Sequence, residues 1–177
     1  MNEDATGARS NPILVWNGLV TEMRRIETEH MKRVEAAHRY DIPVERGFEF
    51  ITDTANWSTF WPGYVRLCEC SRWTTTGDRA SLITRLLGRE RELTMTLTAF
   101  EPNRLVTYTS VQPGLPDASH ERHFEPGDGG FVYRLVVEYE PRGGSAGWFD
   151  RLLLPRAIRR AFVRTFEALD RELASLR

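Results

Sequence analysis

With 177 residues, 41% of them hydrophobic and 28% charged, the chain has the size and composition of one globular domain with a modest extension. Its 24 Lys and Arg are balanced by 25 Asp and Glu, so no overall positive field exists for nucleic acid, which we exclude as a partner. No basic-then-apolar leader and no apolar run of membrane-span length occurs, so we expect a cytoplasmic protein without stable membrane insertion.

Residues 1–32 are predicted to be a separate unit, made of a tail and one helix. Residues 1–10 are small, polar and charged, which indicates a loose tail. Ser10 or Asn11 before Pro12 predicts a helix start, and the apolar residues that follow share one side of a helix to about residue 29. We expect this helix to dock on its own domain, and a homodimer contact is the alternative.

From residue 33 an alternating pattern replaces the helical one and predicts a first strand that ends at Pro43. Residues 44–52 then have the spacing of a short helix. A second short helix carries Trp57, Phe60 and Trp61, and the Pro62-Gly63 pair stops it.

Alternating segments separated by glycine- and proline-containing turns continue to residue 140. Together with the first strand they predict an antiparallel meander of seven strands. The expected ranges of the six later strands are 64–73, 80–87, 91–100, 105–111, 119–125 and 131–140.

The longest helical pattern follows a flexible break at residues 141–147, with a kink or restart expected near Pro155. Its apolar residues, among them Ile158, Phe162 and Phe166, fall within roughly 100° on a helical wheel. Arginines occupy the opposite side and are interpreted as a solvated face, with an acidic membrane surface or partner as the alternative.

One long helix has to cover the apolar face of a wide sheet. A helix is about 10 Å across, whereas seven strands at about 4.8 Å spacing are far wider. The sheet must therefore curl around the helix, and the remaining space is filled by side chains or by a ligand. We predict an α+β helix-grip domain at residues 33–177, with a seven-stranded curved antiparallel sheet around a long C-terminal helix, two short helices after strand 1 and an extra N-terminal helix.

Several segments resemble the polyketide cyclase/dehydrase and lipid-transport superfamily, which is related to START domains. They are residues 38–45, 48–53, 56–57 and 60–63, together with a C-terminal run that begins at Trp148-Phe149-Asp150. The resemblance covers roughly residues 33 to 177. It implies a cavity whose lid or mouth lies near the second short helix, so the aromatic residues there are interpreted either as stacking partners for a ligand or as core.

Turn lengths give a register for the strands. A two-residue loop at Gly88-Arg89 pairs Arg85 with Glu92, and a four-residue loop at 126–129 places Phe124 opposite Phe131. His120 and Arg122 then point inward with Tyr108 and Tyr133, and the segment 112–118 is expected to form the opposite lip of the opening. The alternative is a register shifted by one residue, which sends His120 and Arg122 to solvent.

The predicted ligand-contacting residues share inward positions or proximity to the second short helix. They are Trp57, Phe60, Trp61, Leu82, Leu86, Met95, Leu97, Tyr108, His120, Arg122, Phe124, Tyr133, Phe162 and Phe166. An inward Arg122 requires a carboxylate, or an anionic or carbonyl-bearing ligand, because an unpaired buried charge is costly.

The sequence motifs do not support a metal site or a cofactor site. His120 and His123 are three apart on a strand and therefore face opposite ways. The pair Cys68 and Cys70 lacks further zinc ligands and is interpreted as two reduced thiols. No nucleophile elbow or phosphate loop occurs, so we assign no metal, no cofactor and no catalytic residue.

The favoured function is binding or transport of a hydrophobic small molecule, such as a lipid or polyketide, between sheet and helix. The alternative is a polyketide cyclase or dehydratase that uses acid-base residues of the same cavity. A second alternative is a protein-interaction module without a ligand, which predicts a filled and dry interior.

Overall fold

The computed structural model describes residues 31–86 and 88–176, and the contacts divide the chain into residues 1–31 and a compact unit that begins at Lys32. The predicted N-terminal helix and its homodimer contact lie outside the described residues. The elements are β1 (Lys32–Tyr40), α2 (Val44–Thr52), the 3-10 turn η1 (Thr54–Asn56), α3 (Trp57–Phe60), β2 (Tyr64–Cys70), β3 (Arg79–Leu86), β4 (Arg89–Glu101), β5 (Leu105–Val111), β6 (Ala118–Gly127), β7 (Gly130–Tyr139), α4 (Gly144–Leu152) and α5 (Leu154–Ala174).

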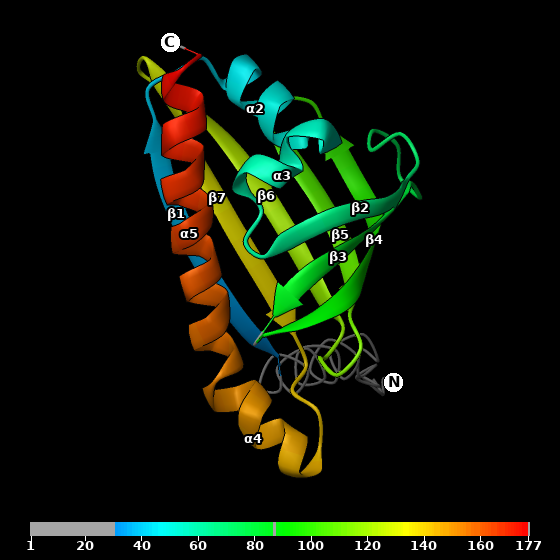
Figure 1. Ribbon diagram of the computed structural model, residues 1–177. Helices are drawn as coiled ribbons and strands as arrows, with labels where there is room; N and C mark the ends of the chain where they lie inside the picture. Colours follow the sequence, from blue (N-terminus) through cyan, green and yellow to red (C-terminus); the bar gives the residue numbers. More distant parts are fainter. Residues whose placement is uncertain (1–30, 87, 177) are drawn as a thin grey trace, which may run out of the picture. The chain divides into compact units, whose positions relative to one another are not determined.

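The described strands form a seven-stranded antiparallel sheet in the order β1-β7-β6-β5-β4-β3-β2. Figure 1 shows α5 running along the strands at the β1 end, while β2, β3 and β4 bend around to the other side. The predicted α+β helix-grip fold is therefore confirmed. The C-terminal helical pattern is divided in two, because the chain restarts at Leu154 with Pro155 in the first turn of α5.

Two predicted hairpin registers are wrong by two residues. Leu86 pairs with Arg89, and Arg85 therefore lies opposite Glu90 and not opposite Glu92. Arg85 and Glu90 form a 2.7 Å ion pair. In the β6–β7 hairpin, Gly127 pairs with Gly130 and Phe124 with Tyr133. Asp128-Gly129 is a two-residue turn there, with Gly129 at a φ of 71° that favours glycine.

A shift of two residues leaves each side chain on its predicted face, because successive side chains in a strand alternate. Leu82 lies opposite Leu93 in place of Met95 but stays on the predicted inward face, and Leu97 lies opposite Tyr108. Arg122 is only 6% exposed and therefore points inward. The one-residue alternative is excluded, since Glu121 and His123 pair with each other at 2.8 Å and are each about one-third exposed.

The core fills the end of the sheet beneath α2 and α3, which Figure 1 places at the upper end. α2 is amphipathic and buries Val44, Phe48 and Ile51. The Phe48 ring meets the Phe124 ring edge to face, with centroids 4.9 Å apart. This end of the interior is therefore occupied by the chain's own side chains, and any free volume lies further along α5.

Candidate functional site

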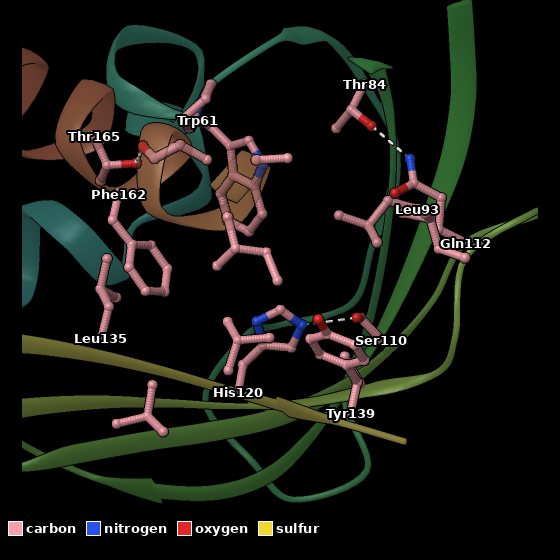
Figure 2. Close-up of a pocket in the computed structure, with 18 of the residues that line it drawn as sticks. Trp61, Thr84, Leu93, Ser110, Gln112, His120, Leu135, Tyr139, Phe162 and Thr165 are labelled. Atoms are coloured by element: carbon pink, nitrogen blue, oxygen red, sulfur yellow. Dashed lines mark hydrogen bonds between the residues drawn. The ribbon is translucent and has the colours of Figure 1, made fainter. Parts of the chain in front are cut away.

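A cavity of about 230 Å³ lies between the sheet and α5 and is open to solvent. Its walls come from the end of α3, from strands β3 to β7, from the segment between β5 and β6, and from the first turns of α5. Figure 2 shows Trp61 and Phe162 on one side of this space and Leu93 and Gln112 on the other, with His120 between them. The lining is mainly apolar and carries a few polar groups, which is typical of small-molecule sites.

The predicted ligand-contacting residues fall into two groups. Those on the cavity wall are Phe60, Trp61, Tyr108, His120, Arg122, Tyr133 and Phe162. Those buried in the core away from the cavity are Trp57, Leu82, Met95, Leu97, Phe124 and Phe166. The second group points inward as expected, but α2 and α3 cover that part of the sheet, and the side chain of Leu86 lies outside the described part of the chain.

Many wall residues were absent from the predicted set, among them five on α5: Leu154, Ala157, Ile158, Ala161 and Thr165. Ala157 and Ala161 are four apart and therefore lie on one helix face, which also carries Leu154 and Thr165. Small side chains on the inner face of a covering helix leave volume unfilled. The spacing of Ala157 and Ala161 was therefore the sequence signal that could have located the cavity. The segment expected as the opposite lip contributes Gln112, Leu115 and Pro116 to the wall, and Gln112 donates a 2.9 Å hydrogen bond to Thr84 on β3.

Arg122 is the charged group at the centre of the site. Its Nη2 donates to the Tyr108 hydroxyl at 3.1 Å, and its guanidinium carbon lies 4.9 Å from the Trp61 ring centre. The buried Nε has no hydrogen-bond partner, and no described Asp or Glu forms an ion pair with Arg122. A buried cation compensated only by π-systems and one hydroxyl retains an unmet need for an oxygen acceptor.

His120 is neutral at physiological pH. Burial, followed by the charge of Arg122, lowers the pKa of His120 to about 3. Its ring stacks on Tyr108 at 4.5 Å with an interplanar angle of 5°, and its Nε2 shares a 2.8 Å hydrogen bond with Ser110. The imidazole therefore contributes a flat, uncharged wall beside the Arg122 guanidinium.

His120 should make the protein less stable in mild acid. Its folded pKa of about 3 lies below the ordinary value of 6.5, so between these values the unfolded chain binds a proton that the folded protein does not. The free energy of unfolding therefore falls as pH falls below 6.5. At about 1.4 kcal/mol per pKa unit, and discounted for water in the open cavity, we expect a loss of about 2 kcal/mol from pH 7 to 4.5.

Urea unfolding of the wild type and of His120→Gln at both pH values measures this effect. Glutamine keeps a polar partner for Ser110 but does not titrate. Between the two pH values the free energy of unfolding of the variant should therefore fall less than that of the wild type, by the loss expected for His120. Equal declines would contradict the assignment of a depressed pKa to His120.

Within the described residues no helix is long and apolar enough to cross a membrane, and no cluster of three or more His, Cys, Asp or Glu is arranged to hold a metal ion.

The fold and the cavity define a helix-grip domain of the ligand-binding class. Residues 31–174 match the family model described as polyketide cyclase/dehydrase and lipid transport, and the chain belongs to this family. No curated protein shows a significant match.

Solved structures agree with this fold at low sequence identity. An aromatase/cyclase, Zhui, from Streptomyces sp. R1128 matches with a TM-score of 0.71 and 18% identity over 84% of this chain and 97% of that one. A protein from Rhodobacter sphaeroides matches with a TM-score of 0.65 and 18% identity over 82% and 93%. Protein Ms6760 from Mycobacterium smegmatis matches with a TM-score of 0.66 and 14% identity over 80% and 90%.

Proposed function

We propose that this protein binds a hydrophobic small molecule of lipid or polyketide type in the cavity, with an anionic or carbonyl oxygen of that molecule beside Arg122. The observation that carries the proposal is the buried Arg122 guanidinium, whose Nε has no partner, at the wall of an apolar cavity. A ligand oxygen that reaches the guanidinium from the cavity would accept a hydrogen bond from it and compensate the charge. The family to which the chain belongs supports this choice of ligand class.

The dimensions suit a modest ligand. An apolar cavity of about 150 Å³ is enough to hold benzene, and this cavity measures about 230 Å³. Each 100 Å² of apolar ligand surface removed from water contributes about 2.5 kcal/mol. Affinity would therefore come from the apolar wall, and orientation from Arg122.

Matched ligand pairs test the proposal. A medium-chain fatty acid and an aromatic 1,3-diketone are each compared with the corresponding hydrocarbon by calorimetric titration at pH 7.5. We expect each oxygen-bearing acid or diketone to bind at least about tenfold more tightly than its control, since charge-assisted hydrogen bonds are the strong ones. Equal affinities within each pair would refute the role of Arg122, and no binding of any of the four would refute the cavity as a binding site.

A second candidate is cyclisation of a linear poly-β-ketone, and the arrangement of Tyr108 favours it. The Tyr108 hydroxyl accepts a hydrogen bond from Arg122, so its own proton remains available to a ligand. An enol carbon of the bound chain would attack a ketone carbon to form the new C–C bond. The ketone oxygen, polarised by Arg122, would take the Tyr108 proton, and the enol would release its own proton to water. One of the structures with this fold is an aromatase/cyclase.

Tyr108→Phe separates the two candidates. It retains the ring that stacks on His120 but removes the proton donor. For a carrier we expect ligand affinity to stay within about threefold of wild type, with no turnover in either protein. For a cyclase we expect wild-type turnover that falls by about 100-fold in the variant while affinity is retained. The interaction-module alternative predicts a filled interior, and the cavity counts against it.

A further inference from the structure

Three large apolar side chains are exposed where α4 meets α5. Trp148 is 62% exposed, Leu152 45% and Leu153 41%. Trp148 and Leu152 are four residues apart on α4, so they lie on the same side of that helix. An exposed tryptophan next to two exposed leucines is an unusual surface for a domain that has apolar burial available elsewhere.

The rotation of α4 is fixed by its opposite side, so these side chains cannot turn inward. Asp150 is fully buried and accepts hydrogen bonds from Arg142 N at 3.0 Å and from Arg142 Nε and Nη2 at 2.8 Å each. Gly147 packs so closely that a Cβ there would lie 2.2 Å from the Arg142 carbonyl oxygen. With Asp150 and Gly147 facing the body of the domain, Trp148 and Leu152 are held toward solvent.

The same region carries a concentrated positive charge although the net charge of the chain is −1. Residues 151–166 contain no Asp or Glu, and all their arginines are exposed: Arg151, Arg156, Arg159, Arg160 and Arg164. None of them forms an ion pair with any residue that the structure describes. On a wheel of 100° per residue the four on α5 fall within about 140°, together with the exposed Val163.

From these observations we propose that α4 and the first turns of α5 dock on an anionic lipid surface. Tryptophan and leucine enter the boundary between headgroups and acyl chains, and arginines above them pair with lipid phosphates and carboxylates. A second copy of the chain is a poor partner, because two copies would place their arginine faces against each other. The sequence at residues 12–29 carries both Glu22, Glu27 and Glu29 and Arg24 and Arg25, so it offers the arginines little net charge.

Docking of this surface would leave the cavity separated from the lipid by α5, a helix about 10 Å across. The side of α5 opposite the arginines carries Leu154, Ala157 and Ala161, which form part of the cavity wall. The inference goes beyond the proposed function, since it assigns a lipid-docking surface that lies outside the ligand cavity. Ligand affinity in free solution does not depend on docking to the lipid surface.

Co-flotation of the full chain with vesicles tests the proposal. Vesicles of phosphatidylcholine with 30% phosphatidylserine should bind the wild type at 0.1 M NaCl and release it at 0.5 M, whereas pure phosphatidylcholine should bind far less. Trp148→Ala should lower the partition constant about tenfold. The double variant Arg160→Gln/Arg164→Gln should lower it about 25-fold, at roughly fivefold for each arginine.

Arg72→Gln is the matched control, because Arg72 is an exposed arginine in the connection between β2 and β3, which Figure 1 places at the end of the molecule away from α4. This variant should bind like the wild type. All variants should retain wild-type melting temperatures and wild-type affinity for the fatty-acid probe in solution. Three results would each overturn the proposal: equal binding to both vesicle types, equal effects of Arg72→Gln and Arg160→Gln/Arg164→Gln, or no vesicle binding by a folded wild type. The third result overturns it also when the protein proves to be a dimer that buries Trp148.

Discussion

Arg122→Met should stabilise the ligand-free protein by about 1–2 kcal/mol and weaken binding of a carboxylate ligand by about 100-fold. The stability gain is expected because Arg122 is 6% exposed and has no carboxylate partner among the described residues. Replacement of a buried charge by an apolar side chain of similar length removes a desolvation cost. The Tyr108 hydrogen bond and the contact with Trp61 are lost as well, and they reduce the gain to this range.

The stability gain arises in the ligand-free protein, whereas the loss of affinity arises in the complex. In a complex the ligand oxygen and the guanidinium are both desolvated, so removal of the guanidinium leaves the ligand charge unpaired, a change that typically costs 2–5 kcal/mol. A residue that destabilises the free protein while it increases ligand affinity is typical of a binding site and is unexpected in a structural core.

Urea unfolding and calorimetric titration of the same samples measure both effects. Arg85→Met is the matched control, since Arg85 also borders the cavity but is 61% exposed and paired with Glu90. Its replacement should change stability by less than about 1 kcal/mol and fatty-acid affinity by less than about threefold. If Arg122→Met is destabilising and leaves carboxylate affinity intact, Arg122 has a structural role and our account of the site is wrong.

Asp150→Ala should destabilise the protein by about 2–4 kcal/mol. Asp150 is fully buried and accepts hydrogen bonds from the Arg142 backbone and guanidinium, while the neighbouring Tyr139 hydroxyl donates to the Asp150 carbonyl oxygen at 2.7 Å. Loss of one partner of a buried pair typically costs 3–5 kcal/mol. The Arg142 side chain is 35% exposed and gains hydration in the variant, which lowers the expected value.

The contribution of Asp150 also has a definite pH dependence. Hydrogen bonds from the Arg142 side chain hold the pKa of Asp150 below its ordinary value of 3.8. Its stabilising effect is therefore fully present above that value and is lost as pH falls below it.

Urea unfolding at pH 7 measures the cost of Asp150→Ala. Asp170→Asn serves as the control, because Asp170 is half exposed and its ion pair with His38 lies at the surface; we expect a change below about 1 kcal/mol. A loss below that size for Asp150→Ala as well would show that α4 is not anchored by this pair.

The strand faces could be predicted because alternation of side chains is strict. Both register errors were steps of two residues, caused by misplaced turn residues at Gly88 and Gly129, and such a step preserves the face. The inward positions of Arg122 and Tyr133 therefore followed from the pattern even though their cross-strand partners did not.

The division of the inward residues into wall and core could not be predicted in the same way. Trp57 and Trp61 belong to the same short segment, yet Trp57 is fully buried and Trp61 borders the cavity. The difference depends on how α2 covers the sheet, which is a property of tertiary packing and not of local periodicity. The position of the free volume was indicated only by the small residues Ala157 and Ala161 on α5.

The central claim is that the space between the sheet and α5 holds a small molecule, and native mass spectrometry after gentle purification tests it most directly. The wild type should carry an additional mass that organic extraction releases as a lipid or polyketide. Ala161→Phe, which fills the cavity, should lack that mass, while Ala174→Phe on the exposed end of the same helix should retain it. A wild type without additional mass that binds neither the fatty acid nor the diketone, or an additional mass equally present in Ala161→Phe, would contradict the account.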